Sequence, residues 1–252
     1  MNKIIIHHNT GLGDHLICNG IVNYFSENNK VYLICNKKNL PSIRYLYMDN
    51  KNVKVLPIYR NNKFEKFFIN IINYVFRKNF TNSEKLLSKL YSLILRVEIL
   101  YVGFDDVTYP EWDKSFYKSV GLEFNIRYDY FKLPENQTVE ITDVTEEFIF
   151  IQDTSSQGKY NLKISTSKEK IILDSMKTDN FFDCLKYVYK ASEIHCIDSS
   201  LIHLIEGIVP NKKQKLFFHD VERYNQKSVP NAKFHMRHHW NIIKYKETSS
   251  FY

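Results

Sequence analysis

Glycine and proline are scarce in this chain, which has 7 Gly and 6 Pro among its 252 residues. Such low counts argue against a low-complexity or intrinsically disordered protein, because those chains are rich in these residue types. Hydrophobic residues make up 44% and charged residues 25% of the sequence, as in ordinary globular proteins. The chain is long enough for one large domain or for two small ones, each with its own core.

Cysteine is also rare. The four cysteines, Cys18, Cys35, Cys184 and Cys196, stand among apolar residues, without a Cys-x-x-Cys pair or a histidine at zinc-ligand spacing. This pattern favours buried free thiols in a reducing compartment. The apolar run at residues 4–6 meets polar residues at once, so it predicts neither a signal peptide nor a membrane span. We therefore expect a cytoplasmic protein.

The net charge of +7 would suit a partner that carries phosphate groups, such as nucleic acid, an anionic membrane surface or a nucleotide. The basic residues are spread along the chain, however, and form neither a Lys/Arg tract nor a recognisable nucleic-acid-binding module. Diffuse positive charge is usually a solvated surface. We therefore expect no nucleic acid as a partner.

Short apolar runs alternate with helical patterns in the first part of the chain. Runs at 3–7, 31–35 and 53–56 predict strands, and helices are predicted at 16–25 and 43–48. This alternation is typical of a parallel sheet with crossover helices. Because the strands are short and continuously apolar, we expect both faces of the sheet to be covered.

Two amphipathic helices are predicted next. The first apolar stripe comprises Phe64, Phe67, Phe68, Ile71, Ile72 and Val75, and the second comprises Leu86, Leu87, Leu90, Leu93 and Ile94. Basic residues flank the first stripe, and a basic amphipathic helix can lie on an anionic membrane. Most amphipathic helices pack on their own sheet, which is the expectation here, and a peripheral membrane contact remains the alternative.

The second part of the chain repeats the alternation after an irregular, aromatic-rich connection at 109–134. A strand is predicted at 99–102, before the connection, and a helix at 113–120, within it. After the connection, strands are predicted at 148–152, 170–173, 194–197 and 216–218, and helices at 181–189 and 201–208. We expect an α/β fold of two Rossmann-like halves, residues 1–140 and 141–252, which face each other across a ligand cleft.

The first candidate site is the sequence Gly11-Leu12-Gly13-Asp14-His15 between the first strand and the first helix. Glycines let the backbone turn tightly and approach a ligand at the helix N-terminus. The third glycine of the dinucleotide fingerprint and the acidic residue after the second strand are missing, which disfavours NAD. Asp14 is either a first-turn residue that complements the helix dipole or a carboxylate that takes a proton from an attacking hydroxyl.

The second candidate site is Asp198-Ser199-Ser200-Leu201-Ile202-His203, at the carboxyl end of a predicted strand. Ser199 or Ser200 can cap the following helix. The hydroxyl groups, the free N–H groups and His203 could instead cradle a diphosphate, because ligands of open α/β sheets bind at this edge. We favour phosphate binding over capping alone.

The third candidate site is the polar loop at 153–159, which contains Ser155, Ser156 and Lys159. A lysine in a loop is usually solvated, but this one closely follows a strand and has hydroxyl groups and a glycine beside it. It could neutralise a leaving diphosphate as a point charge.

The histidine-rich segment at 235–240 suggests a metal site at first sight. Its spacing does not place two histidines on one helical face together with a carboxylate. We therefore expect a surface or interface segment and no metal site.

These motifs, in this order, resemble those of the GT-B glycosyltransferases, and within them the heptosyltransferase-like group (glycosyltransferase family 9). In that group a Gly-Asp pair like Gly13-Asp14 precedes an apolar helix. A lysine like Lys159 follows the first strand of the second half. An Asp-Ser pattern with a histidine one turn later matches Asp198, Ser199 and His203.

The resemblance implies a transfer of sugar from a nucleoside-diphosphate sugar to a hydroxyl group of a glycan or lipid-linked acceptor, with inversion and without a cofactor or metal. It implies Asp14 as the catalytic base toward the acceptor, on the side lined by Gly11, Gly13 and His15. The implied contacts to the donor are Ser155, Ser156, Lys159, Asp198, Ser199, Ser200 and His203.

Two other functions remain open. The first is a nucleotide- or sugar-binding module or scaffold subunit, in which Asp14 is structural and its carboxylate turns back onto its own helix. The second is an epimerase that acts on a sugar nucleotide, which would need a second acid/base pair such as His7 and His8.

Overall fold

A computed structural model describes residues 1–58, 83–104, 107–108, 111–135, 147–208, 210, 212–221 and 234–245. The chain divides into two compact units. The N-terminal unit comprises Met1–Asp106 and Phe116–Pro134, and the C-terminal unit comprises Val107–Ser115 and Glu135–Tyr252. The expected helix at 64–75 lies outside the described residues.

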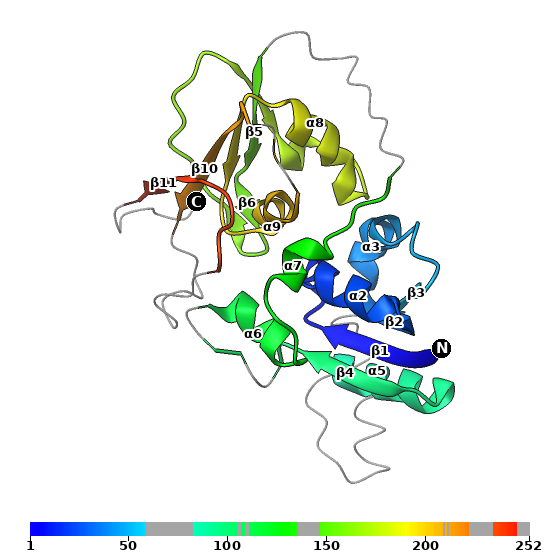
Figure 1. Cartoon of the computed structure of the whole chain (residues 1–252). Coiled ribbons are helices and arrows are strands. Elements are labelled where there is room, and N and C mark those ends of the chain that lie inside the picture. Colours follow the sequence, from blue (N-terminus) through cyan, green and yellow to red (C-terminus); the bar gives the residue numbers. More distant parts are fainter. Residues whose placement is uncertain are drawn as a thin grey trace. The chain divides into compact units, whose positions relative to one another are not determined.

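Four parallel strands form the sheet of the N-terminal unit, in the order β3-β2-β1-β4 (Figure 1). The strands are β1 (Asn2–His8), β2 (Asn29–Asn36), β3 (Val53–Ile58) and β4 (Glu98–Val102). The helices of this part of the chain are α1 (Leu12–Ile17), α2 (Asn19–Ser26), the 3-10 turn η1 (Lys37–Asn39), α3 (Leu40–Leu46) and α5 (Ser83–Leu95). The predicted strands and the parallel α/β arrangement are confirmed.

The helix predicted at 16–25 is two helices, because the chain bends at Cys18 between α1 and α2. A segment far along the sequence packs at this bend. The Tyr117 hydroxyl donates to the carbonyl oxygen of Ile17 at 2.6 Å, and the Asn19 side-chain oxygen accepts from the backbone N–H of Lys132 at 2.8 Å. The connection expected to be irregular is therefore bound to α1 and α2 by directed hydrogen bonds.

Gly20 permits this packing. A Cβ atom at Gly20 would lie 2.4 Å from the carbonyl oxygen of Ile126, in the short helix α7 (Ile126–Asp129). The nearest atoms, from Ile126 and Arg127, all belong to the backbone, so no side-chain rotation can relieve such a clash. Gly20→Ala is expected to lower the free energy of unfolding by about 3 kcal/mol, measured by urea denaturation. Lys118→Ala, at an exposed position, should change it by less than about 0.5 kcal/mol; equal losses in both variants would contradict the packing argument.

Helix α5 covers one face of this sheet. Leu87, Tyr91 and Leu95 pack against a core that includes Ile5, Tyr32, Ile34, Leu56, Ile58 and Val97. The predicted stripe of α5 is only half right: Leu87 faces the sheet, but Leu90, Leu93 and Ile94 are exposed. Both sides of this helix are apolar, so periodicity could not say which side faces the sheet.

The C-terminal unit contains a second parallel sheet, in the order β11-β10-β9-β5-β8. Its strands are β5 (Phe148–Gln152), β8 (Glu169–Ile172), β9 (Glu193–Cys196), β10 (Lys215–Asp220) and β11 (Asn241–Lys244). The loop predicted at 153–159 contains a small hairpin of β6 (Thr154–Ser155) and β7 (Gly158–Lys159). Strand β11 was not predicted, because it is an edge strand with only two apolar residues.

The other helices of the described residues are α6 (Trp112–Lys118), the 3-10 turns η2 (Leu173–Ser175) and η3 (Phe181–Cys184), α8 (Leu185–Lys190) and α9 (Ser200–Gly207). Phe150 of β5 stacks on Tyr187 of α8, with ring centroids 5.7 Å apart. The chain passes from one unit to the other within α6.

The cysteines and the helix lengths bear on two sequence expectations. All four cysteines are buried free thiols, as predicted. Burial raises the pKa of the Cys35 thiol to about 12, so this thiol stays protonated at neutral pH. Within the described residues, no helix combines the length and the apolar character that crossing a bilayer requires.

Candidate functional site

The loop after β1 brings Gly11 and Asp14 together. Gly11 is the N-cap residue of α1 and makes no side-chain cap, and Gly13 and Asp14 lie in the first turn of that helix. A Cβ atom at Gly11 would lie 2.5 Å from Oδ2 of Asp14. The Asp14 carboxylate therefore turns back over the N-terminus of its own helix, where the helix dipole favours a negative charge. A side chain at position 11 would therefore displace the Asp14 carboxylate from this place.

His15 lies in the interior of the N-terminal unit. Its side chain is fully buried, and its ring meets that of His8 edge-on with centroids 4.3 Å apart. Neither ring nitrogen has a hydrogen-bond partner among the described residues. Burial, followed by the charges of His8 and His7, holds the pKa of His15 well below its usual range. In this structure His15 lies on the buried side of α1 and does not reach the surface expected to bind the acceptor.

His7 and His8 complete a buried histidine cluster. His7 Nδ1 lies 2.9 Å from the Ser88 hydroxyl, and His8 Nδ1 lies 2.5 Å from the carbonyl oxygen of Asn9. Burial is the main cause that lowers the pKa of His7 to about 3 and that of His8 to about 4. Both imidazoles are neutral and fully buried. An epimerase would need an acid/base pair that can reach its substrate, so these two histidines do not suit that function.

Glu84 is a residue of this region that sequence reasoning missed. It lies in the first turn of α5, is 8% exposed, and accepts a hydrogen bond from the Thr10 hydroxyl at 3.2 Å. The Asn39 side chain donates to the carbonyl oxygen of Thr10 at 2.8 Å. The loop that carries Asp14 is therefore held from two sides, by α5 and by the turn after β2.

The N-terminus of α9 is capped by Gln152, at the end of β5. The Gln152 side-chain oxygen accepts from the backbone N–H of Leu201 at 2.9 Å, and its nitrogen donates to the Ser200 hydroxyl at 3.2 Å. Ser199 is the N-cap residue but makes no side-chain cap. The alternative in which Ser199 or Ser200 caps the helix is therefore wrong. A polar residue at the end of an apolar strand was the available signal for Gln152.

Asp198 and His203 lie close together. His203 Nε2 is 3.7 Å from Oδ1 of Asp198. The His203 ring is 3% exposed and contacts the rings of Trp112 and Phe234, with centroids 6.0 and 4.9 Å away. His203 is therefore held between aromatic side chains one turn into α9, behind the partly exposed Ser199 and Ser200.

Lys159 projects from the hairpin toward solvent. Its side chain is 65% exposed, and Nζ lies 3.5 Å from Oδ2 of Asp153. Ser156 is exposed, whereas the Ser155 hydroxyl accepts from the backbone N–H of Gln157 within the turn. Asp153, which sequence reasoning missed, therefore partly neutralises the cation that was expected to meet a diphosphate.

The histidine-rich segment at 235–240 docks on α9. The buried Glu206 carboxylate accepts hydrogen bonds from the Trp240 indole at 2.7 Å and from the backbone N–H of Arg237 at 2.5 Å. His238 Nε2 lies 2.9 Å from the carbonyl oxygen of Ile208. No three His, Cys, Asp or Glu side chains of the described chain are placed to hold a metal ion. The segment is a strap on the helix that carries Ser200 and His203.

Loss of the Glu206 charge is expected to weaken the binding of the segment at 235–240 to α9. Glu206→Gln should lower the free energy of unfolding by about 3 kcal/mol, because a buried carboxylate that accepts several N–H groups loses charge-assisted hydrogen bonds. Urea denaturation of the variant measures this effect. The control is Glu98→Gln, at an exposed position, and an effect of the same size in the control would contradict the argument.

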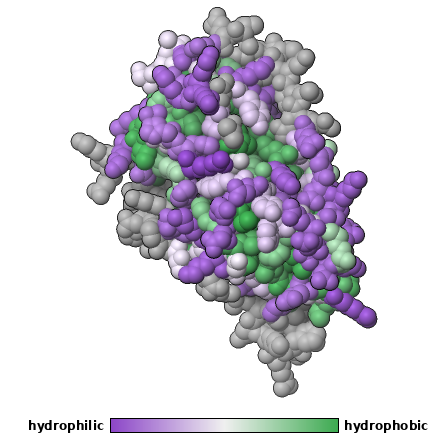
Figure 2. Space-filling model, viewed as in Figure 1, coloured by the Kyte–Doolittle hydropathy of each residue, from purple (hydrophilic) through white to green (hydrophobic). Residues whose placement is uncertain are grey.

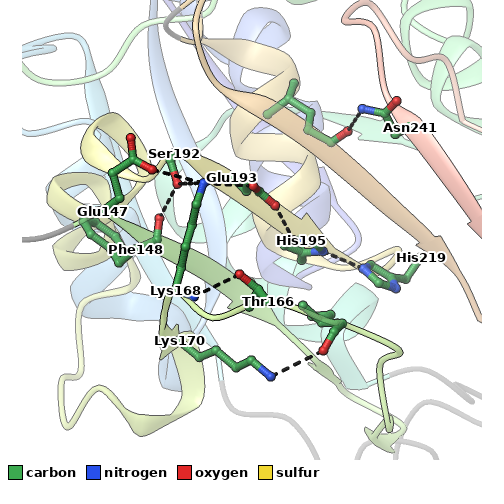
Figure 3. A network of polar contacts seen from close by, with 12 residues as sticks. Glu147, Phe148, Thr166, Lys168, Lys170, Ser192, Glu193, His195, His219 and Asn241 are labelled. Carbon is green, nitrogen blue, oxygen red and sulfur yellow. Dashed lines mark hydrogen bonds and ion pairs between the residues drawn. The ribbon is translucent and has the colours of Figure 1, made fainter.

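A chain of polar contacts crosses the C-terminal sheet (Figure 3). His195 Nδ1 lies 2.9 Å from Nε2 of His219. Nδ1 of His219 lies 2.7 Å from the Tyr245 hydroxyl. At the other end His195 Nε2 lies 3.6 Å from Glu193, which pairs with Lys168 at 3.0 Å. The Glu193 carboxylate favours a proton on His195 Nε2, and in that tautomer His195 Nδ1 accepts from His219 and His219 Nδ1 accepts from the Tyr245 hydroxyl. The contacts between these side chains thus link the tautomer of His195 to that of His219.

The fold is similar to that of a known glycosyltransferase. The solved structure of E. coli ADP-heptose LPS heptosyltransferase II matches with a TM-score of 0.51 and 9% sequence identity, over 99% of this chain and 92% of that one. The expected resemblance to this group is confirmed at the level of the fold, as is the α/β class with two parallel sheets. No protein-family model and no curated protein sequence matches the chain.

Proposed function

We propose that this chain is a metal-independent, inverting glycosyltransferase that moves a sugar from a nucleoside-diphosphate sugar to a hydroxyl group of a glycan or lipid-linked acceptor. The observation that carries the proposal is the fold likeness to the heptosyltransferase, which extends over 99% of the chain. At 9% identity this likeness supports the class of reaction and leaves the donor sugar and the acceptor open.

Three groups at the carboxyl edge of the second sheet would hold the donor diphosphate. They are the N-terminus of α9 with Ser199 and Ser200, the hairpin with Lys159 and the exposed Ser156, and Asp198 with His203. Ligands of open α/β sheets bind at this edge, and a helix N-terminus attracts anions. The N-terminal unit would hold the acceptor beside Gly11, Gly13 and Asp14.

The reaction in this proposal is a single displacement. Asp14 takes the proton of the acceptor hydroxyl, and the oxygen attacks the anomeric carbon from the side opposite the leaving group. The bond from that carbon to the phosphate oxygen breaks, and the nucleoside diphosphate leaves with the electron pair. Lys159 and the N–H groups at the start of α9 would stabilise the negative charge that develops on it.

A second candidate is a nucleotide- or sugar-binding module without catalysis. One observation favours it: the Asp14 carboxylate turns back over Gly11 at the start of its own helix. This is the orientation expected of a structural first-turn acid. The two candidates share the donor site and differ only in whether Asp14 takes a proton.

A thermal-shift screen against nucleoside diphosphates and their sugars, in EDTA, tests the donor site. A ligand at about one hundred times its Kd stabilises the protein by about 2.7 kcal/mol, which raises Tm by a few degrees at this size. We expect such a shift with one nucleotide family and its loss in Lys159→Ala. Lys177→Ala, at an exposed position of the same unit, should retain the shift. No shift with any nucleotide would contradict both candidates.

A further inference from the structure

The outer side of α5 carries an exposed apolar stripe. Leu90, Leu93 and Ile94 are 49%, 75% and 68% exposed. With the half-buried Leu86 they follow the spacing i, i+4, i+7, i+8, which places them in one line along the helix. The opposite side of α5 already packs on the sheet. Single exposed apolar residues are ordinary, but a line of four along one helix calls for a partner.

Exposed cations stand near the amino ends of the strands that α5 covers, at the C-terminal end of α5 and on the helix itself. Lys3, Lys30 and Lys54 are exposed, and each stands two residues before a core residue that α5 covers, so all three lie on the same face of the sheet as α5. The exposed Arg96 follows the C-terminal end of the helix, and Lys89 lies on the helix itself.

Among the described residues, the two acids in or next to α5 do not add negative charge to this side. The acid of α5, Glu84, is 8% exposed and bonded to Thr10. Glu98 is exposed, but it precedes Ile99, which packs beneath α5, so it lies on the opposite face of the sheet. Figure 2 shows apolar atoms at the lower right of the surface, where α5 lies in Figure 1, beside long hydrophilic side chains. An apolar stripe bordered by cations is the pattern of a helix that lies in a membrane interface.

We propose that this face, made by the stripe of α5 with Lys3, Lys30, Lys54 and Arg96, docks on an anionic lipid bilayer. The helix lies in the plane of the interface, with its leucines at the boundary of the acyl chains and the cations against anionic headgroups. Through Glu84 and Thr10, the first turn of α5 is bonded to the loop that carries Asp14.

The size of the stripe favours a bilayer over a protein partner. A specific protein–protein interface buries about 1,200–2,000 Å² of surface and has few charged residues at its centre. Four aliphatic side chains supply only part of that area, and lysines border them. Lipid binding needs less apolar area, because each nearby cation adds attraction to anionic headgroups.

Sedimentation of the full chain with lipid vesicles tests the proposal and needs no substrate. At low salt we expect at least tenfold stronger binding to vesicles of phosphatidylcholine and phosphatidylglycerol (3:1) than to phosphatidylcholine alone, and weaker binding at high salt. Leu93→Glu with Ile94→Glu should weaken binding at least tenfold. Each of Lys3→Gln, Lys30→Gln and Lys54→Gln should weaken it roughly fivefold.

Met48→Glu is the matched control, because Met48 is a 62% exposed apolar residue elsewhere in the same unit; it should bind like the wild type. Wild-type protein that fails to bind anionic vesicles, or a double variant that binds like the wild type, would overturn the proposal. So would a wild-type dimer in light scattering that the double variant dissociates, without vesicle binding. A fall of several degrees in Tm in the double variant, again without vesicle binding by the wild type, would show that the stripe is an internal packing face.

Discussion

Asp14→Asn is expected to lower the rate of sugar transfer by about 10²–10⁴-fold. The substitution keeps the size of the side chain and removes its ability to accept a proton, which is the contribution that a positioned general base makes. The measurement is kcat from the release of nucleoside diphosphate, with the acceptor saturating. Affinity for the nucleoside diphosphate should not change, because the residues proposed to hold the donor lie in the other unit of the chain.

Two further variants make this prediction decisive. Asp174→Asn, at an exposed carboxylate, should leave both the rate and the affinity unchanged. Asp14→Ala should retain nucleotide binding with a similarly low rate, provided that its Tm shows a folded protein. Full activity in Asp14→Asn would remove Asp14 from the chemistry and leave its place over Gly11 as a purely structural one.

Acid is expected to unfold this protein far above the pH at which most carboxylates are protonated. The folded-state pKa is about 3 for His7 and about 4 for His8 and His219, in each case chiefly through burial. In the unfolded chain these groups titrate near 6.5. Below pH 6.5 the unfolded state therefore binds more protons than the folded state, so stability falls as the pH falls. Above pH 7 these groups leave stability unchanged.

The size of this effect follows from the number of buried imidazoles. Each should lower the free energy of unfolding by about 2 kcal/mol between pH 7 and pH 5. That gives about 4 kcal/mol in the N-terminal unit from His7 and His8, to which buried His15 adds a further loss, and about 2 kcal/mol in the C-terminal unit from His219. Urea denaturation at a series of pH values, with probes in each unit, measures both.

His15 offers a specific control for the acid effect. Its ring nitrogens have no hydrogen-bond partner among the described residues. His15→Leu therefore replaces a titrating side chain by an apolar one of similar size and leaves no other polar group without its partner. Below pH 6.5, the free energy of unfolding of the variant should fall less steeply with pH than that of the wild type, by about 1.4 kcal/mol per pH unit. His239→Gln, at an exposed position, should not change it. A stability curve that is flat from pH 7 to pH 5 would contradict the buried, neutral state of the cluster.

Much of the fold could be predicted from hydrophobic periodicity. The strands that became β1, β2, β5 and β9 are short, apolar and centrally placed, so burial on both faces left a clear pattern in the sequence. Edge strand β11 left no such pattern. The orientation of α5 was ambiguous for the opposite reason, since its two sides are both apolar and only the sheet selects between them.

The candidate site could be predicted only in part. The position of Ser199, Ser200 and His203 at the start of a helix after a strand could be predicted, because the change from an apolar run to a helical pattern is visible in the sequence. The cap from Gln152, the ion pair of Asp153 with Lys159 and the burial of His15 depend on contacts between separate elements. Glu206 shows the same limit, because an acid within a helix gives no sign that a segment about thirty residues later will bind it.

The central claim is that the chain transfers sugar from a nucleoside-diphosphate donor. The most direct test incubates the wild-type protein in EDTA with a panel of nucleoside-diphosphate sugars and a mixture of glycan and lipid-linked acceptors, and measures the nucleoside diphosphate released. The account predicts release from donors of one nucleotide family, dependent on acceptor and lost in Asp14→Asn. Nucleotide binding without any release would contradict transfer and leave a binding module, and the absence of both would leave the fold without this function.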